Sequence, residues 1–227
     1  MLILGIDTSC ANAGAALIRD GAVVGTVAQA DKRTHSVKLL PEIQALLESN
    51  SLSPSMLDLI AVTAGPGSFT GLRIGASTAK TMARALDIPV VGVNTLDALC
   101  ASELAASDSG LPVLALIDAR NTRAYGCLYV KGAPACAPAV EKTDILINSI
   151  PHDYSGSSVR VCGDALNSKG IKDILDAEKR FSFITDGGVL YPDPAAVAVL
   201  GGALFEKAED KTVFAPEKLS LNYMKEW

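Results

Sequence analysis

The chain has 227 residues, of which 49% are hydrophobic and 20% charged, with a formal net charge of −5. This length supplies enough core for one large or two modest domains, without help from disulfides or a structural metal. The negative charge argues against a broad basic surface, from which most affinity for nucleic acid derives. If RNA is involved, we expect another protein to hold most of it.

Cysteine usage and the apolar segments point to the cytoplasm. The sequence contains no C-x-x-C pair, so neither a disulfide framework nor a zinc site has support. The apolar start Met1–Ile6 meets Asp7 at once, which is too short for a signal peptide, and no apolar run reaches membrane-spanning length. We therefore expect a cytoplasmic protein without a membrane partner. The five cysteines are Cys10, Cys100, Cys127, Cys136 and Cys162.

The first half of the chain predicts a strand meander followed by alternating helices and strands. Asp20-Gly21 is a two-residue hairpin turn between the second and third strands. Apolar residues at helical spacing predict a helix that starts near Pro41 or kinks there. The expected strands are 1–6, 14–18, 22–28, 59–63 and 90–93, and the expected helices are about 37–48, 70–86 and 94–106.

The second half repeats this order after the flexible stretch Ser107-Asp-Ser-Gly110. We therefore predict an α/β fold of two lobes, residues 1–108 and 109–227, each a mixed sheet with flanking helices. The last segment could also pack back on the first lobe. The expected strands are 112–117, 123–130, 135–140, 159–162 and 181–184, and the expected helices are 144–150 and 194–207.

Two loops of the first half carry candidate phosphate-binding groups. Asp7, Thr8 and Ser9 follow a buried strand, where such a turn can bind a phosphate, although the same side chains commonly hydrogen-bond the turn itself. The segment Thr63–Gly75 is a strand end, a glycine loop and a helix start, with Gly65 and Gly67 allowing close approach and either Ser68 or Thr70 as the cap of the helix. It lacks the endings of a P-loop and of a dinucleotide fold. Structural capping alone remains an alternative.

The two first-half helices predict a partner surface. The second of them is apolar on more than one side, which requires cover on more than one side, although complete burial in one domain fits the pattern equally well. We predict that small residues let a partner helix approach and that two helices from each chain form a four-helix contact. The predicted interface residues are Leu39, Leu40, Ile43, Leu47, Leu72, Ile74, Ala76, Ala79, Met82 and Ala83.

Three segments carry a resemblance to a known family. Leu4-Gly-Ile-Asp-Thr-Ser9, His35-Ser-x-x-Leu-Leu-Pro-Glu-Ile43 and the glycine loop through Gly75 resemble the signatures of the TsaB (YeaZ) family, most densely over residues 1 to about 100. Leu116-Ile-Asp-Ala-Arg120 and Val161-Cys-Gly-Asp164 are similar to its weaker landmarks. Leu221-Asn-Tyr-Met-Lys225 departs from the usual Pro-x-Tyr-Leu-Arg, so the role of a terminal arginine does not carry over.

This resemblance implies an actin-like, sugar-kinase-like (ASKHA) fold and a function without catalysis. Family members are expected to pair with TsaD, which transfers threonylcarbamoyl to adenosine 37 of tRNAs that read codons beginning with A, and to work with the TsaE ATPase. Self-association to a homodimer is expected to compete with this pairing. The chain would meet tRNA only through the complex. No intrinsic cofactor is expected, and ATP or ADP is a candidate ligand at the interface of the complex.

The residue types argue against two enzymatic alternatives. The metal pair of TsaD-like chains would fall on Thr95 and Leu99, neither of which can replace an imidazole, so we expect no metal and no metalloprotease activity. His35 and His152 form no metal-binding pattern. A small-molecule kinase would use Asp7 for metal-bound phosphates, Asp118 as base and Gly163 near an adenine nucleotide. We rank it lower because the second half has no matching phosphate turn.

Overall fold

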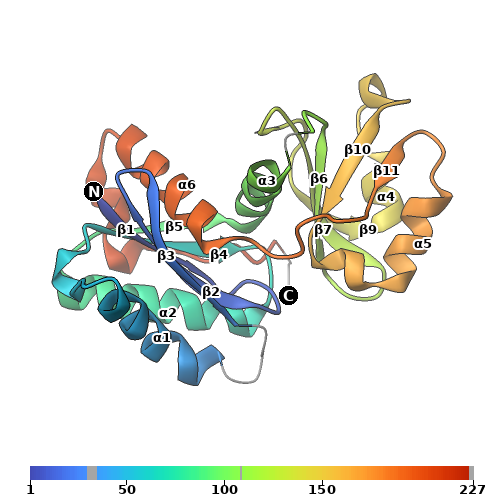
Figure 1. Ribbon diagram of the computed structural model, residues 1–227. Helices are drawn as coiled ribbons and strands as arrows, with labels where there is room; N and C mark the ends of the chain where they lie inside the picture. The colour runs from blue at the N-terminus through green and yellow to red at the C-terminus, as the bar shows by residue number, and fades with distance from the viewer. Residues whose placement is uncertain (30–34, 108, 225–227) are drawn as a thin grey trace. The chain divides into compact units, whose positions relative to one another are not determined.

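A computed structural model describes residues 1–29, 35–107 and 109–224, which form two compact units (Figure 1). The first unit combines Met1–Ala98 with Asp193–Tyr223, and the second is built on Leu99–Pro192. The sequence predicted a division after residue 108, which itself lies outside the described residues. In the structure the division falls earlier, inside helix α3 (Thr95–Ala106), and the chain returns to the first unit after Pro192.

The first unit is built on a five-stranded sheet in the order β3-β2-β1-β4-β5. Its first three strands form the predicted antiparallel meander, and β4 and β5 extend the sheet in parallel. All residues of β1 and β4 are buried, as expected for strands that are covered on both faces. The strands are β1 (Leu2–Asp7), β2 (Ala13–Arg19), β3 (Ala22–Gln29), β4 (Leu59–Gly65) and β5 (Val90–Asn94).

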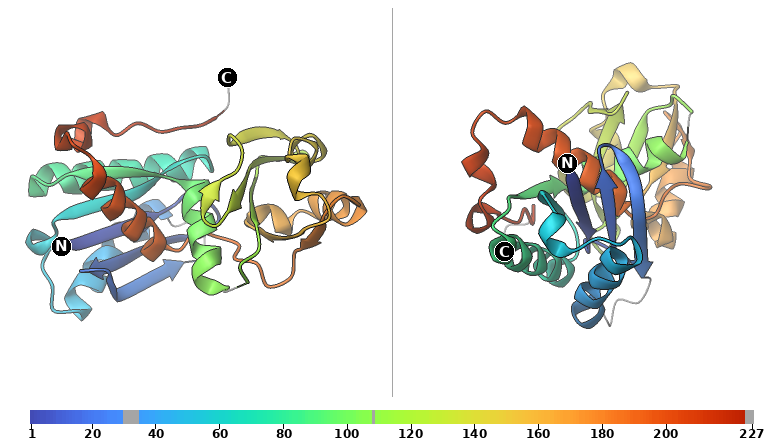
Figure 2. Two further views of the ribbon diagram at one scale, coloured as in Figure 1. Left: turned by 90° about the horizontal axis from the view of Figure 1, so that it is seen from above. Right: turned by 60° about the vertical axis from the view of Figure 1, so that its left-hand side comes forward.

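Helices cover both faces of this sheet. In Figures 1 and 2, α1 (His35–Ser49) and α2 (Phe69–Leu86) lie on one face and α6 (Pro194–Lys207) lies on the other. Glycines let α6 approach closely, because a Cβ at Gly5 would lie 2.1 Å from the carbonyl oxygen of Pro194. The helix that was predicted last therefore belongs to the first unit.

The second unit contains a sheet in the order β11-β10-β6-β7-β8, with β9 also paired to β7. Helices α4 (Thr143–Asn148) and α5 (Lys169–Ala177) pack on one face through residues such as Leu146 and Ile171. The predicted two-lobed α/β fold is thus confirmed. The strands are β6 (Val113–Asp118), β7 (Arg123–Val130), β8 (Ala133–Pro134), β9 (Ala139–Lys142), β10 (Ser158–Cys162) and β11 (Ser182–Ile184).

Two local predictions for the second unit were wrong. The strand expected over 135–140 forms only from Ala139, where β9 begins, and residues 135–138 lie between β8 and β9; Pro138 offers no N–H to a ladder. Helix α5 was not predicted, although Ile171, Ile174 and Leu175 recur at helical spacing.

The second half of α3 is anchored to the second unit by a buried acid. Glu103 is 1% exposed, pairs with Arg160 and accepts a 2.7 Å hydrogen bond from the Val189 amide. Burial, together with the nearby Glu103 carboxylate, raises the pKa of the Cys162 thiol well above its ordinary value. No helix in the described part of the chain is both long and apolar enough to cross a membrane.

Candidate functional site

The turn after β1 is held by its own side chains. Asp7 Oδ1 accepts hydrogen bonds from the Ser9 amide (3.1 Å), from Ser9 Oγ (2.6 Å) and from Thr63 Oγ1 at the end of β4 (2.8 Å). Asp7, Thr8 and Ser9 are all buried. One carboxylate oxygen of the predicted phosphate-binding acid is therefore engaged within the protein, which is the alternative that the sequence left open.

The glycine loop packs directly on this turn. Thr8 Oγ1 donates a 2.7 Å hydrogen bond to the Gly71 carbonyl, and the Ser68 amide donates to the Ser9 carbonyl at 2.7 Å. A Cβ at Gly71 would lie 2.0 Å from the Thr8 carbonyl oxygen, and one at Gly67 would lie 2.4 Å from that of Ser9. Ser68 Oγ accepts from the Gly71 amide at 3.2 Å, so the cap of α2 is Ser68, one of the two residues that the sequence offered. Contacts inside the protein thus require these glycines.

A C-terminal segment, which the sequence analysis allowed to pack back on the first lobe, covers the other side of the loop. The Asn222 amide donates to the Ala64 carbonyl at 2.7 Å, and a Cβ at Gly65 would lie 2.0 Å from the Asn222 carbonyl oxygen. The Tyr223 ring lies 5.1 Å from that of Phe69, and its hydroxyl accepts a 3.2 Å hydrogen bond from Arg73. The atypical end of the sequence is therefore part of the first unit up to Tyr223, while Lys225 lies outside the described residues.

The two remaining nucleotide candidates lie in the second unit. Asp118 is exposed at the end of β6, where its carboxylate accepts a 2.7 Å hydrogen bond from the Arg120 amide. Gly163 has a φ of 112°, and a Cβ there would lie 1.9 Å from the Leu116 carbonyl oxygen. The structure therefore brings Asp7, Thr8, Ser9, Gly65, Gly67 and Ser68 together in one unit and Asp118 and Gly163 together in the other. A nucleotide site that joins the two groups stays a prediction.

The two positions of α3 at which the sequence analysis expected metal ligands in TsaD-like chains carry no metal-binding side chain here. Thr95 and Leu99 are both fully buried, and the Thr95 hydroxyl has no hydrogen-bond partner among the described atoms. Asn94 caps the helix, with its Oδ1 accepting from the Leu96 amide at 2.8 Å. Within residues 1–29, 35–107 and 109–224, no three or more His, Cys, Asp or Glu side chains gather in a way that could hold a metal ion. His152 lies in a short 3-10 turn of the second unit.

Most of the predicted interface residues are core residues, which corrects that part of the prediction. Packing inside the first unit buries the small residues of α2 and the leucine stripe of α1, although Ile43 and Leu47 also line a hollow between the two helices. Leu40 is 54% exposed, and Ile74 and Met82 are half-buried. The residues that are instead buried in the chain's own core are Leu39, Ile43, Leu47, Leu72, Ala76, Ala79 and Ala83.

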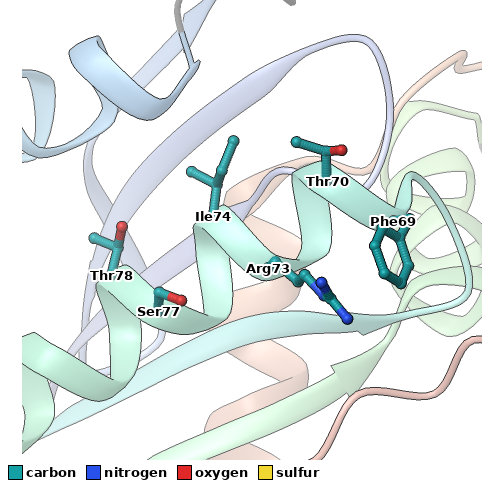
Figure 3. A pocket seen from close by; sticks show the side chains of 6 residues that line it. All are labelled: Phe69, Thr70, Arg73, Ile74, Ser77 and Thr78. Carbon is teal, nitrogen blue, oxygen red and sulfur yellow. The ribbon is translucent and has the colours of Figure 1, made fainter.

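A groove on the outer side of α1 and α2 remains open. One hollow of about 460 Å³ lies along α2, where Figure 3 shows Phe69 and Arg73 at one end and Thr78 at the other. A second hollow of about 260 Å³ lies between Leu40 of α1 and Met82 of α2. Val37, Leu40 and Phe69 are 72%, 54% and 38% exposed. We call this surface the α1–α2 groove and define it by Val37, Leu40, Gln44, Phe69, Arg73, Ile74, Thr78 and Met82.

The chain forms two α/β units, and the mixed sheet of the first begins with a three-stranded meander and lies between helices. This is the actin-like, sugar-kinase-like fold. More distant solved structures share the fold alone, and one of them, at 10% identity, aligns with a TM-score of 0.53 over 91% of this chain. The model of the family "TsaD: tRNA N6-adenosine threonylcarbamoyltransferase" matches residues 19–185. The Escherichia coli protein named "tRNA threonylcarbamoyladenosine biosynthesis protein TsaB" is 31% identical over 94% of this chain and 90% of its own length. The chain belongs to the TsaD-related TsaB (YeaZ) family.

Two further similarities fit this membership. The Bacillus subtilis protein of the same name is 40% identical over 57% of this chain, and that alignment spans 55% of the relative's length. A crystal structure from Pseudomonas aeruginosa, described as an uncharacterized protein with similarity to peptidase YeaZ, is 25% identical with a TM-score of 0.84, and the match covers 99% of both chains.

Proposed function

We propose that this protein is a non-catalytic subunit in the formation of threonylcarbamoyladenosine on tRNA, and that it pairs with the catalytic subunit TsaD through the α1–α2 groove. Membership of the TsaB family, whose relatives are named for this pathway, supports the first part. The observation that carries the second part is the exposed Leu40, which lines the hollow between α1 and α2, together with the exposed Val37 one turn earlier on α1. The site of action would be the cytoplasm.

The groove offers what a helical partner needs. Burying a valine or leucine side chain fully is worth roughly 1.5–3 kcal/mol, so Val37, Leu40 and Phe69 together could anchor one side of a four-helix contact. Arg73 lies at one end of the groove with its guanidinium carbon 3.8 Å from the Phe69 ring centre, which adds a polar edge to the apolar centre. The same surface would pair with a second copy when TsaD is scarce, so homodimer and heterodimer would compete.

The residues at the start of α3 support a non-catalytic role. Thr95 and Leu99 stand where the catalytic relatives' metal ligands would be expected, and neither side chain can bind a transition metal well. The proposal therefore leaves the chemistry to TsaD and assigns nucleotide turnover to TsaE, with tRNA reached through the complex. No specific observation favours the kinase or metalloprotease alternatives.

The proposal is tested with a matched pair of charge substitutions on opposite faces of one sheet. Leu40→Glu places a carboxylate in the groove, whereas Leu204→Glu places one on α6, and the two leucines are 54% and 46% exposed. We expect Leu40→Glu to weaken binding to TsaD at least tenfold in calorimetric titration, because a buried unpaired charge is costly. The control should bind as the wild type does.

Both variants should keep the wild-type circular dichroism spectrum, since each substituted side chain is exposed. Sedimentation equilibrium should show the same loss for the homodimer, and reconstituted tRNA modification should fall in parallel. Unchanged affinity of a folded Leu40→Glu variant for TsaD would refute the groove as the interface. Modification that proceeds equally well without this chain would refute the assigned role.

A further inference from the structure

We propose that one edge of the second unit binds the phosphodiester backbone of RNA, an inference that rests on the proposed role in tRNA modification. The surface consists of Arg120 in the loop between β6 and β7, Arg123 at the start of β7, Lys142 at the end of β9, and Lys169 at the start of α5. All four side chains are exposed. We call these residues the basic loop cluster.

The loop that carries Arg120 and leads into Arg123 has a defined and unusual backbone. Arg120, Asn121 and Thr122 have consecutive φ values of 69°, 54° and 57°, although none of them is a glycine. Such left-handed residues are costly and gather at functional sites. The Ala119 amide donates to the Arg123 carbonyl at 3.0 Å, and the Thr143 amide and hydroxyl both donate to the Thr122 carbonyl at 2.9 Å. The cations are therefore held on a fixed frame.

Pairing between strands places two of the cations side by side. Arg123 lies directly opposite Lys142 in the antiparallel pair of β7 and β9, so both side chains leave the same face. Like charges in this position are destabilising. Glu141 lies opposite the buried Ala124, on the other face, and does not separate them. An anion that binds both would remove this repulsion.

A third cation approaches from a different element. A Cβ at Gly170 would lie 3.0 Å from the Thr122 methyl group, which brings the neighbouring Lys169 beside the loop. Lys169 opens α5, where the amide ends of the helix add positive potential. Two strands, one loop and one helix thus contribute to a single basic surface.

The nearby acids leave these charges available. In the described part of the chain, none of the four cations lies within ion-pair distance of a carboxylate, and the Arg123 side chain donates a hydrogen bond to the Val140 carbonyl at 3.4 Å. Asp118 accepts from the Arg120 backbone, whereas Asp144 and Asp173 are exposed on α4 and α5. Such a local excess of cations does not follow from a chain with a net charge of −5.

The chemistry of the cluster fits a nucleic-acid backbone in the assembled complex. Arginine and lysine neutralise phosphates and release counterions, and the exposed Asn121 and Thr122 supply further hydrogen-bonding groups. Four cations give only weak affinity alone, in the range of roughly 10⁻⁴ to 10⁻⁶ M that is typical of non-specific binding. Tethered beside a catalytic subunit that also holds the RNA, the cluster would act at high effective concentration.

The test compares two pairs of charge-removing substitutions in the full chain. Arg123→Gln with Lys142→Gln removes two cations of the cluster, and Lys179→Gln with Lys207→Gln removes two exposed cations elsewhere. In complex with TsaD, tRNA affinity is measured by fluorescence anisotropy across a salt series. We expect the cluster variant to bind at least fivefold more weakly at 0.1 M salt and to lower the salt slope by about 1.4–1.8. The control pair should do neither.

A second arm separates this proposal from the proposed function. The isolated chain is titrated with tRNA at 20 mM salt, where the wild type should bind more tightly than the cluster variant even if TsaD does not pair with it. Equal affinity and equal salt slope for both variants would overturn the RNA surface. Unchanged tRNA binding combined with loss of an acidic protein partner would also overturn it, in favour of a protein-docking role.

Discussion

The packing of the glycine loop on the Asp7–Ser9 turn can be tested by a double-mutant cycle at Thr8 and Gly75. A Cβ at Gly75 would lie 2.3 Å from Thr8 Oγ1, 3.3 Å from Val62 and 3.5 Å from Thr8 Cβ. The close contact is therefore with one oxygen atom, and removing that atom should relieve it. If the glycine instead served only an approaching ligand, the two positions would not interact.

The expected magnitudes follow from the geometry. Gly75→Ala should lose about 1–3 kcal/mol to overpacking and regain about 1 kcal/mol from the better helix propensity of alanine. Thr8→Ala breaks the 2.7 Å hydrogen bond to the Gly71 carbonyl and should cost about 1–2 kcal/mol. In the double variant the new Cβ takes the space of the missing oxygen, so its destabilisation should be about 1–3 kcal/mol smaller than the sum of the single effects.

The cycle is measured by equilibrium urea unfolding, followed by far-UV circular dichroism, with equal m-values required for all four proteins. Thermal unfolding gives a second reading, at about 2–4 °C per kcal/mol for a chain of this length. Additivity of the two single effects within about 0.5 kcal/mol would refute the packing explanation.

Two further predictions concern single side chains. Thr95→Val should raise the free energy of unfolding by about 1 kcal/mol, because it removes a buried hydroxyl without a partner, whereas Thr95→Ser should not, and thermal unfolding distinguishes the two. Amide hydrogen bonds from Arg180 and Lys179 lower the pKa of Glu178 below its ordinary 4.5, so its stabilisation is present above that pH and is lost as the pH falls through the folded-state pKa. Glu178→Gln should therefore be destabilising at pH 7 in urea unfolding, and the difference from wild type should shrink in acid; a constant difference from pH 7 to pH 3 would contradict this.

Local patterns predicted most of the fold, because the spacing of apolar residues indicates strands and helices. The meander, the hairpin at Asp20 and the long helix after the glycine loop all follow from short-range signals. The position of α6 does not follow from short-range signals, because nothing in the sequence Pro194–Lys207 distinguishes a helix of the second unit from one that packs on the first. In the structure α6 packs closely on Gly5 of the first unit. A contact between residues so far apart in the sequence leaves no local signal.

The partner surface shows the same limit on a smaller scale. The apolar periodicity of α1 and α2 identified two helices with more apolar surface than one face needs. Periodicity does not show which side chains pack against the sheet. The prediction therefore assigned the core residues Leu39 and Ala79 to the interface together with the exposed Leu40. Val37 and Phe69, which belong to the proposed partner surface, were not predicted because they fall outside the regular stripe. The sequence offered the hydrogen-bonded turn at Asp7 as one of two interpretations, but the contact of Thr8 with Gly71 required three-dimensional information.

The discontinuous first unit has a consequence for how the protein is made. During synthesis β1 leaves the ribosome before the other strands of its sheet, yet one face of that sheet stays uncovered until Lys207 has emerged, because α6 supplies that cover. The second unit is continuous from Leu99 to Pro192 and can complete its core before the segment after Pro192, which the first unit needs, has been synthesised. A nascent chain of this design exposes Ile3 and Ala61, which finally pack near α6, for most of its translation. Chaperones should therefore bind mainly to the strands of the first unit that α6 finally covers.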